Sequence, residues 1–180
     1  PVGFGDLGRY LALLFEPVLA TLRSRSQEAF VAVLVDTSKS MTLKANEYQD
    51  PADRLAIGRL AGLVDPAAKD VKAGSLPPQT EAALKALTRQ QTAEAVLNST
   101  ELALLKRLAE LHRVKIYAFD AGTVPVPDSV PVRLPAADGN SSRLGDALRR
   151  VQGEHQGKLA GVILLTDGRS NAGEDPEISA

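Results

Sequence analysis

Two long apolar runs, each leading to an aspartate, are the clearest pattern along this chain. The first covers residues 30–35 and ends at Asp36, and the second covers residues 159–165 and reaches Asp167 after one threonine. Apolar runs of this length that are rich in β-branched residues are typical of strands buried on both faces of a sheet. Open α/β sheets bind ligands just beyond the carboxyl ends of such strands. The pattern therefore predicts two core strands whose following loops carry functional side chains.

Helical and strand patterns alternate through the rest of the chain. The sequence predicts helices at 53–64 and 144–151, two helices within 80–111 that separate near 98–100, and further strands at 114–119 and 130–134. The strand at 130–134 lies between proline-rich turns, and proline is tolerated mainly at sheet edges, so we expect it at an edge. Strands that alternate with helices imply right-handed crossovers and a mostly parallel sheet.

Oxygen-bearing side chains follow both predicted core strands. Asp36, Ser38 and Ser40 alternate after the first strand, where a loop leaving the strand tip can turn all three towards one point. Thr166-Asp167-Gly168 follows the other strand. A polar segment at 139–143 precedes the helix predicted at 144–151 and brings a hydroxyl to its start, which is typical of an N-cap. A donor set made only of oxygen suits a hard cation such as Mg²⁺ rather than Zn²⁺.

Taken together, these three segments resemble the von Willebrand factor A domain. In that family an Asp-x-Ser-x-Ser motif, a Thr from a second loop and an Asp from a third form a metal-ion-dependent adhesion site. The matching residues are Asp36, Ser38 and Ser40 for the first motif, Ser142 for the second and Asp167 for the third. Ser142 keeps the hydroxyl of the usual Thr, and Ser141 is a competing candidate for the same role. The resemblance extends over residues 30–175.

The resemblance implies a three-layer α-β-α, Rossmann-like fold of the α/β class. Its mostly parallel sheet would have the spatial order 3-2-1-4, with 130–134, 114–119, 30–36 and 159–166 as neighbours in that sequence. In this family two more strands usually follow, so we expect residues 30–180 to form a C-terminally truncated domain. A structure with 159–166 anywhere but beside 30–36 would contradict the assignment.

Within the first 29 residues, an apolar segment covers residues 8–22 and is interrupted by Glu16-Pro17. We expect an N-terminal helix and linker that either pack on the domain or a partner or form the trailing end of a transmembrane helix. Bacterial membrane proteins with this domain place it directly after hydrophobic helices, so the resemblance implies a membrane-anchored bacterial protein. The side of the membrane stays open.

The resemblance also implies how the site would work. The hydroxyls of Ser38, Ser40 and Ser142 would bind Mg²⁺ directly, while Asp36 and Asp167 would act through water or by orienting the hydroxyls. Mn²⁺ or Ca²⁺ could take the same place. One open position would accept an acidic side chain from a protein partner. The expected function is therefore a non-enzymatic, metal-dependent protein-binding module for adhesion or complex assembly.

Composition limits the alternatives. A net charge of −1 gives no electrostatic reason to expect a nucleic-acid partner, and the absence of cysteine excludes thiolate metal sites. His112 and His155 are far in sequence from the candidate site, and neither is expected to be catalytic. The competing interpretation is a magnesium-dependent phosphoryl-transfer hydrolase with Asp36 as nucleophile. Haloacid-dehalogenase-like phosphatases need a second aspartate two residues later, where this chain has Ser38.

Overall fold

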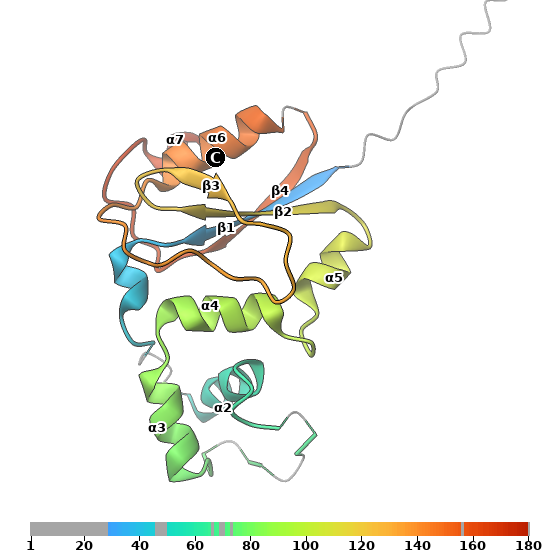
Figure 1. Cartoon of the computed structure of the whole chain (residues 1–180), viewed down its shortest axis with the longest axis vertical. Coiled ribbons are helices and arrows are strands. Elements are labelled where there is room, and N and C mark those ends of the chain that lie inside the picture. Colours follow the sequence, from blue (N-terminus) through green and yellow to red (C-terminus); the bar gives the residue numbers. More distant parts are fainter. Residues whose placement is uncertain are drawn as a thin grey trace, which may run out of the picture.

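A single four-stranded sheet organises the region that the computed structural model describes, residues 29–45, 50–65, 67–68, 71–72, 74–155 and 157–179. The strands are β1 (Phe30–Asp36), β2 (Arg113–Phe119), β3 (Thr123–Pro125) and β4 (Leu159–Leu165). Their spatial order is β3-β2-β1-β4 (Figure 1). The predicted N-terminal helix and linker lie outside the described residues, apart from residue 29.

Central strand β1 is parallel to both of its neighbours. Phe30 to Asp36 pair in register with Arg113 to Phe119 of β2, and β4 runs alongside the other edge of β1. The predicted placement of the strand near 159–166 beside the strand at 30–36 is confirmed. The sheet is mixed only because the short edge strand β3 runs antiparallel to β2.

The edge strand itself was predicted in the wrong place. It lies at Thr123–Pro125, directly after β2, and not at 130–134. A tight turn explains the difference, because the carboxylate of Asp120 accepts a hydrogen bond from the backbone N–H of Gly122 at 2.9 Å. This turn reverses the chain at once, so residues 123–125 take the free edge of β2 before 130–134 can reach it.

Residues 130–134 instead lie along helix α4 (Arg89–Asn98). The side-chain amide of Asn98 accepts a hydrogen bond from Val132 N at 2.6 Å and donates one to Val132 O at 3.0 Å. Leu134 N donates to the Glu94 carboxylate at 3.0 Å. Polar side chains of α4 thus satisfy backbone groups that a sheet would otherwise have paired.

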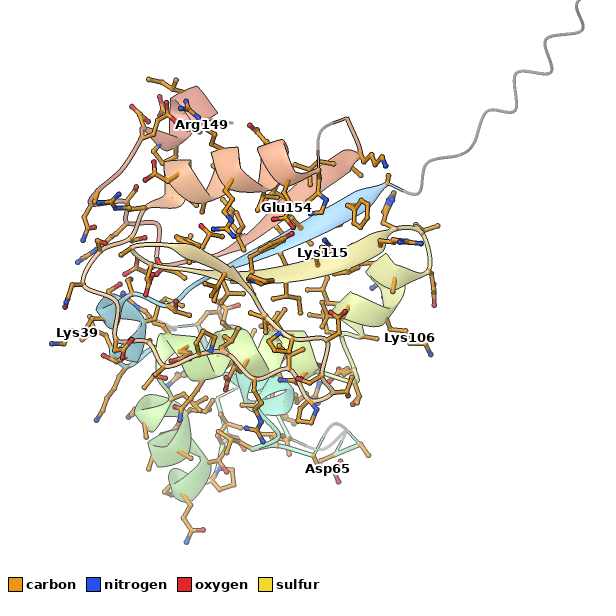
Figure 2. All side chains as sticks on the ribbon, turned by 45° about the horizontal axis from the view of Figure 1, so that its top comes forward. Lys39, Asp65, Lys106, Lys115, Arg149 and Glu154 are labelled. Atoms are coloured by element: carbon orange, nitrogen blue, oxygen red, sulfur yellow. The ribbon has the colours of Figure 1, made fainter. Side chains whose placement is uncertain are left out.

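Helices cover both faces of the sheet, and their side chains fill the space against it (Figure 2). Val33 and Val35 of β1 pack with Ala93 and Leu97 of α4 in one core cluster. The intervening residues Ala32 and Leu34 pack with residues of α6 (Leu144–Glu154), including Ala147, Leu148 and Val151, in a second cluster. Successive side chains of a strand point to opposite faces, so the single apolar run of β1 serves both cores.

The segment between β1 and β2 holds the short 3₁₀-helix η1 (Lys39–Thr42) and four α-helices within the described residues. The four α-helices are α2 (Pro51–Leu60), α3 (Pro78–Ala86), α4 and α5 (Leu104–Ala109). The region 80–111 was predicted as two helices, but a second break occurs at Thr88. There Thr88 and Gln91 form a capping box, with bonds of 2.9 Å and 3.2 Å, that starts α4 as a new helix. One more short helix among the described residues, α7 (Pro176–Ser179), follows β4.

A smaller core joins α2 and α3 through Val64, Leu76 and Leu84. The Asp50 carboxylate caps α2 by accepting a hydrogen bond from Ala52 N at 2.7 Å, so this helix begins at Pro51 and not at residue 53 as the sequence predicted. Among the helices that the structure describes, none is both long and apolar enough to cross a membrane.

Candidate metal centre

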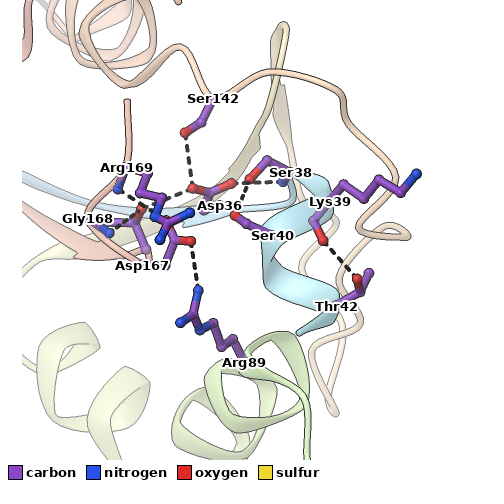
Figure 3. A network of polar contacts seen from close by, with 11 residues as sticks. Asp36, Ser38, Lys39, Ser40, Thr42, Arg89, Ser142, Asp167, Gly168 and Arg169 are labelled. Carbon is purple, nitrogen blue, oxygen red and sulfur yellow. Dashed lines mark hydrogen bonds and ion pairs between the residues drawn. The ribbon is translucent and has the colours of Figure 1, made fainter. Parts of the chain in front are cut away.

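Asp36 lies at the carboxyl end of β1 and connects three loops. Its side chain is fully buried, with 0% of the residue exposed. Oδ1 accepts a hydrogen bond from Ser38 N at 2.8 Å. Oδ2 accepts bonds from the hydroxyls of Ser142 and Thr166, each at 3.0 Å (Figure 3). A single carboxylate thus joins the loops that follow β1, precede α6 and follow β4.

Ser38 and Ser40 lie together on the first of these loops. Their hydroxyl oxygens are 3.0 Å apart, so the alternate spacing brings both side chains to one point, as predicted. Ser38 is the N-cap residue of η1, but its side chain makes no capping hydrogen bond. The Ser38 hydroxyl is therefore directed to the site and not to the helix start.

Ser142 occupies the second loop, and here one prediction was wrong. The hydroxyl before α6 was expected to cap that helix, but the N-cap residue is Arg143 and it makes no side-chain cap. The Ser142 hydroxyl donates to Asp36 instead. Asn171 holds Ser142 in place, because its Oδ1 accepts from Ser142 N at 2.8 Å and its N donates to Ser142 O at 3.1 Å. Of the two candidate serines, Ser142 and not Ser141 is thereby joined to Asp36.

Asp167 lies close by, but it is held by an arginine that sequence reasoning missed. Oδ2 of Asp167 accepts a hydrogen bond from Nη1 of Arg89 at 2.9 Å, and Oδ1 accepts one from Arg169 N at 3.1 Å. The side chains of this ion pair are 2% exposed for Asp167 and 19% exposed for Arg89. Arg89 is the first residue of α4, 78 positions away, and no pattern in the sequence links it to Asp167.

Thr166 is a second residue that the sequence reading left out of the site. Its hydroxyl donates to Asp36 and accepts from Gly168 N at 3.2 Å. The sequence did contain a signal for including Thr166 in the site, because it follows the apolar run directly, next to Asp167, and so brings a hydroxyl to the same strand end. A cavity of about 290 Å³ adjoins this strand end, and Arg89, Thr166 and Asp167 contribute to its wall.

The donor chemistry fits a hard cation. A hydroxyl has one proton and two lone pairs, so the hydroxyls that donate to Asp36 still have oxygen lone pairs to offer a metal ion. The carboxylate fixes their orientation, which is the usual role of groups behind the direct ligands. Within the described residues no three His, Cys, Asp or Glu side chains come together as a metal-binding group. The candidate site combines hydroxyls with only two carboxylates, Asp36 and Asp167.

A separate polar cluster lies at the opposite end of the sheet. The hydroxyl of Tyr117 is 2.8 Å from Nε2 of His155 and donates to Glu154 at 3.1 Å. Lys115 lies 3.6 Å from Glu154, and Figure 2 labels this pair. Burial lowers the pKa of His155, and the Lys115 charge acts in the same direction. Burial, reinforced by Glu154, raises the pKa of Tyr117 to about 12.

Two further carboxylates have structural roles. Asp120 forms the turn after β2. The Asp146 side chain is 43% exposed, and its carboxylate accepts a bond from Glu174 N at 2.9 Å and pairs with Arg143 at 3.5 Å. Asp146 therefore attaches the loop before α7 to α6.

Comparisons of this chain with protein-family models, with curated proteins and with solved structures find no match in any of the three.

Proposed function

We propose that this chain is a divalent-metal-dependent protein-binding domain of the von Willebrand factor A type. One observation carries the proposal: three loops at the carboxyl ends of β1 and β4 and before α6 meet at the buried carboxylate of Asp36. Parallel α/β sheets bind ligands at this edge. The strand order β3-β2-β1-β4 supports the same assignment.

The residues that would hold the ion are the three serines of the site. Ser38, Ser40 and Ser142 offer neutral hydroxyl oxygens, and Mg²⁺, Mn²⁺ and Ca²⁺ all accept oxygen ligands. Asp36 orients Ser142 through its carboxylate, and Asp167 would act through water. Neutral ligands leave most of the charge of the ion uncompensated. The bound ion would therefore attract a carboxylate from a protein partner, which is the chemistry it supplies.

Burial argues against the competing enzyme function. A phosphoryl-transfer nucleophile needs a free oxygen facing its substrate, but both oxygens of Asp36 already accept hydrogen bonds and the residue is 0% exposed. The geometry favours an orienting role for Asp36. Membrane anchoring through the N-terminal segment stays a prediction, since that segment lies outside the described residues.

Calorimetric titration with Mn²⁺ and Mg²⁺ tests the metal site. We expect Asp36→Ala to abolish binding, but loss of this buried carboxylate also threatens the fold. Ser40→Ala removes a ligand whose hydrogen bond is only to Ser38, so the fold should survive while affinity falls by about 10- to 100-fold. Ser75→Ala, at an exposed serine before α3, is the matched control, and circular dichroism verifies folding. Parent-like binding by folded Ser40→Ala and Asp36→Ala would refute the site.

A binding experiment with the source extract tests the recognition function. Partners captured on the immobilised chain should be lost in excess chelator and restored by added Mg²⁺, because the ion would bridge the two proteins. The same partners should not bind the Ser40→Ala chain. Capture that persists unchanged in chelator would show that binding uses another surface.

A further inference from the structure

We propose that Arg89 is a built-in competitor of the divalent ion for Asp167, and that it sets the metal affinity of the site. The inference rests on the proposed function, because it concerns the regulation of the same site. Its basis is the ion pair between Arg89 Nη1 and Asp167 Oδ2 at 2.9 Å (Figure 3). The site thus contains a cation that belongs to the protein itself.

Burial strengthens the electrostatic interaction between Arg89 and Asp167. The Asp167 side chain is 2% exposed and that of Arg89 is 19% exposed, so water screens their interaction far less than it screens a surface pair. Asp167 is also held from its other oxygen by Arg169 N. A carboxylate fixed at both oxygens can turn towards an ion only if one of these bonds is weakened.

The backbone around Arg89 joins this arginine to the loop that carries Ser38 and Ser40. Arg89 N donates to Leu43 O at 3.0 Å, and Ala45 N donates to Leu87 O at 2.8 Å. The capping box at Thr88 fixes the start of α4 in the same place. The guanidinium is therefore presented to the site from a helix start whose backbone is held by hydrogen bonds.

The adjoining cavity gives the Arg89 side chain somewhere to move. This space of about 290 Å³ is lined by Arg89 and Asp167 and also by the apolar side chains of Met41 and Val96. The guanidinium could leave Asp167 by a change of rotamer, without displacement of α4. Asp167 would turn towards the water shell of the ion as it leaves the ion pair, so ion binding and the ion pair oppose each other, and by linkage each weakens the other to the same extent.

Electrostatics gives the direction of the effect. Asp36 and Asp167 contribute two negative charges to the site, and Arg89 cancels one of them. A positive charge a few ångströms from a divalent ion opposes its binding, so removal of that charge by Arg89→Gln should tighten Mn²⁺ binding on the order of tenfold. Arg89→Lys keeps the charge and should stay close to the parent.

Calorimetry of the parent, Arg89→Gln and Arg89→Lys with Mn²⁺ is the test. Arg54→Gln is the matched control, since Arg54 forms an ion pair with Glu81 at 4.0 Å on α2 and α3 and should leave the affinity unchanged. In the Asp167→Asn background, Arg89→Gln should raise the Mn²⁺ affinity less, because the carboxylate for which Arg89 and the ion compete is gone. A purely structural role for Arg89 would not produce this dependence.

The outcomes separate this inference from the proposed function. Tighter binding by Arg89→Gln than by the parent supports the competition, including the case in which only the variant binds. Equal or weaker binding by folded Arg89→Gln, with a parent that binds, overturns the role of Arg89 and leaves the metal site standing. Absence of binding by both chains overturns both proposals.

A second measurement uses the unaltered chain, in case Arg89→Gln does not fold. The side-chain ¹⁵N–¹H signal of Arg89 should shift as Mg²⁺ is added, and the signal of Arg54 should not. If Mg²⁺ binds and the Arg89 signal stays unchanged up to saturation, the competition is refuted.

Discussion

The hydroxyl of Ser142 lies 3.0 Å from Oδ2 of Asp36, although 106 positions separate the two residues along the chain. The contact joins the loop before α6 to the end of the central strand. Asn171 supports it from a third segment by binding both backbone polar groups of Ser142. The candidate metal centre therefore depends on the docking of α6 and its flanking loops against the sheet.

The first prediction concerns this hydroxyl. Ser142→Ala should lower Mn²⁺ affinity by about 10- to 100-fold, because it removes an oxygen ligand that Asp36 orients. It should also destabilise the apo chain by about 1–3 kcal/mol, since a buried carboxylate loses one of its donors. Ser142→Thr keeps the hydroxyl and should retain binding. Calorimetry and urea denaturation measure the two effects, and unchanged affinity in Ser142→Ala would remove Ser142 from the ligand set.

A second prediction uses two glycines of the same helix, α6. A Cβ at Gly145 would overlap the backbone carbonyl of Glu174, whereas one at Gly153 would have nothing within 4 Å. Gly145→Ala should therefore push the loop before α7 away from α6 and cost about 1–3 kcal/mol. Gly153→Ala should be neutral or stabilise by about 0.4–1 kcal/mol.

Urea denaturation measures both glycine variants. Asn171 follows β4 in the segment that leads to Glu174, so Gly145→Ala should also weaken metal binding through Ser142, and calorimetry checks this. Equal stability of the two variants would show that the loop does not pack on α6 as described.

The third prediction compares two leucines in neighbouring strands. Leu34 of the central strand β1 is 0% exposed, while Leu164 of β4 is 40% exposed. Leu34→Ala should destabilise the chain by about 2–5 kcal/mol, because a rigid core cannot refill the lost volume. Leu164→Ala should cost about 1 kcal/mol or less. Denaturant melts of the two variants measure the difference, and similar costs would contradict the central position of β1.

A fourth prediction concerns pH. The pKa of His155 in the folded chain is lowered from 6.5, so the unfolded chain binds more protons in the range between the two values. The stability contributed by neutral His155 is present above pH 6.5 and is lost as the pH falls through its lowered pKa. We expect the melting temperature to drop between pH about 7.5 and about 5 as His155 is forced to charge beside Tyr117 and Lys115.

His155→Gln isolates this effect. It removes the titrating imidazole, so the melting temperature should depend less on pH over the same range. His112→Gln removes the other imidazole and should leave the slope in place. A slope that disappears in His112→Gln and persists in His155→Gln would show that His112, and not His155, causes the pH dependence, and would contradict the prediction.

The sequence by itself determined the strands β1 and β4 and their pairing. The apolar run at 30–35 is buried on both faces in the centre of the sheet, as its pattern predicts, whereas the run at 159–165 forms an edge strand of the described sheet and stays partly exposed. The alternate spacing of Asp36, Ser38 and Ser40 also placed their side chains together at one strand end, because alternate positions there can turn to the same side. The helices predicted from residues 53 and 144 begin at Pro51 and Leu144, because helical periodicity is a local signal, although the expected side-chain cap of α6 is absent.

Only the tertiary structure decided which segment takes the edge of β2 and which cation faces Asp167. The edge depended on competition between 123–125 and 130–134, which the three-residue turn 120–122 decided and a propensity scale does not measure. Arg89 reaches Asp167 because α4 packs across the sheet, a geometry set by the whole core. Contacts between residues this far apart in sequence follow from packing and from the docking of loops, which leave no local pattern in the chain.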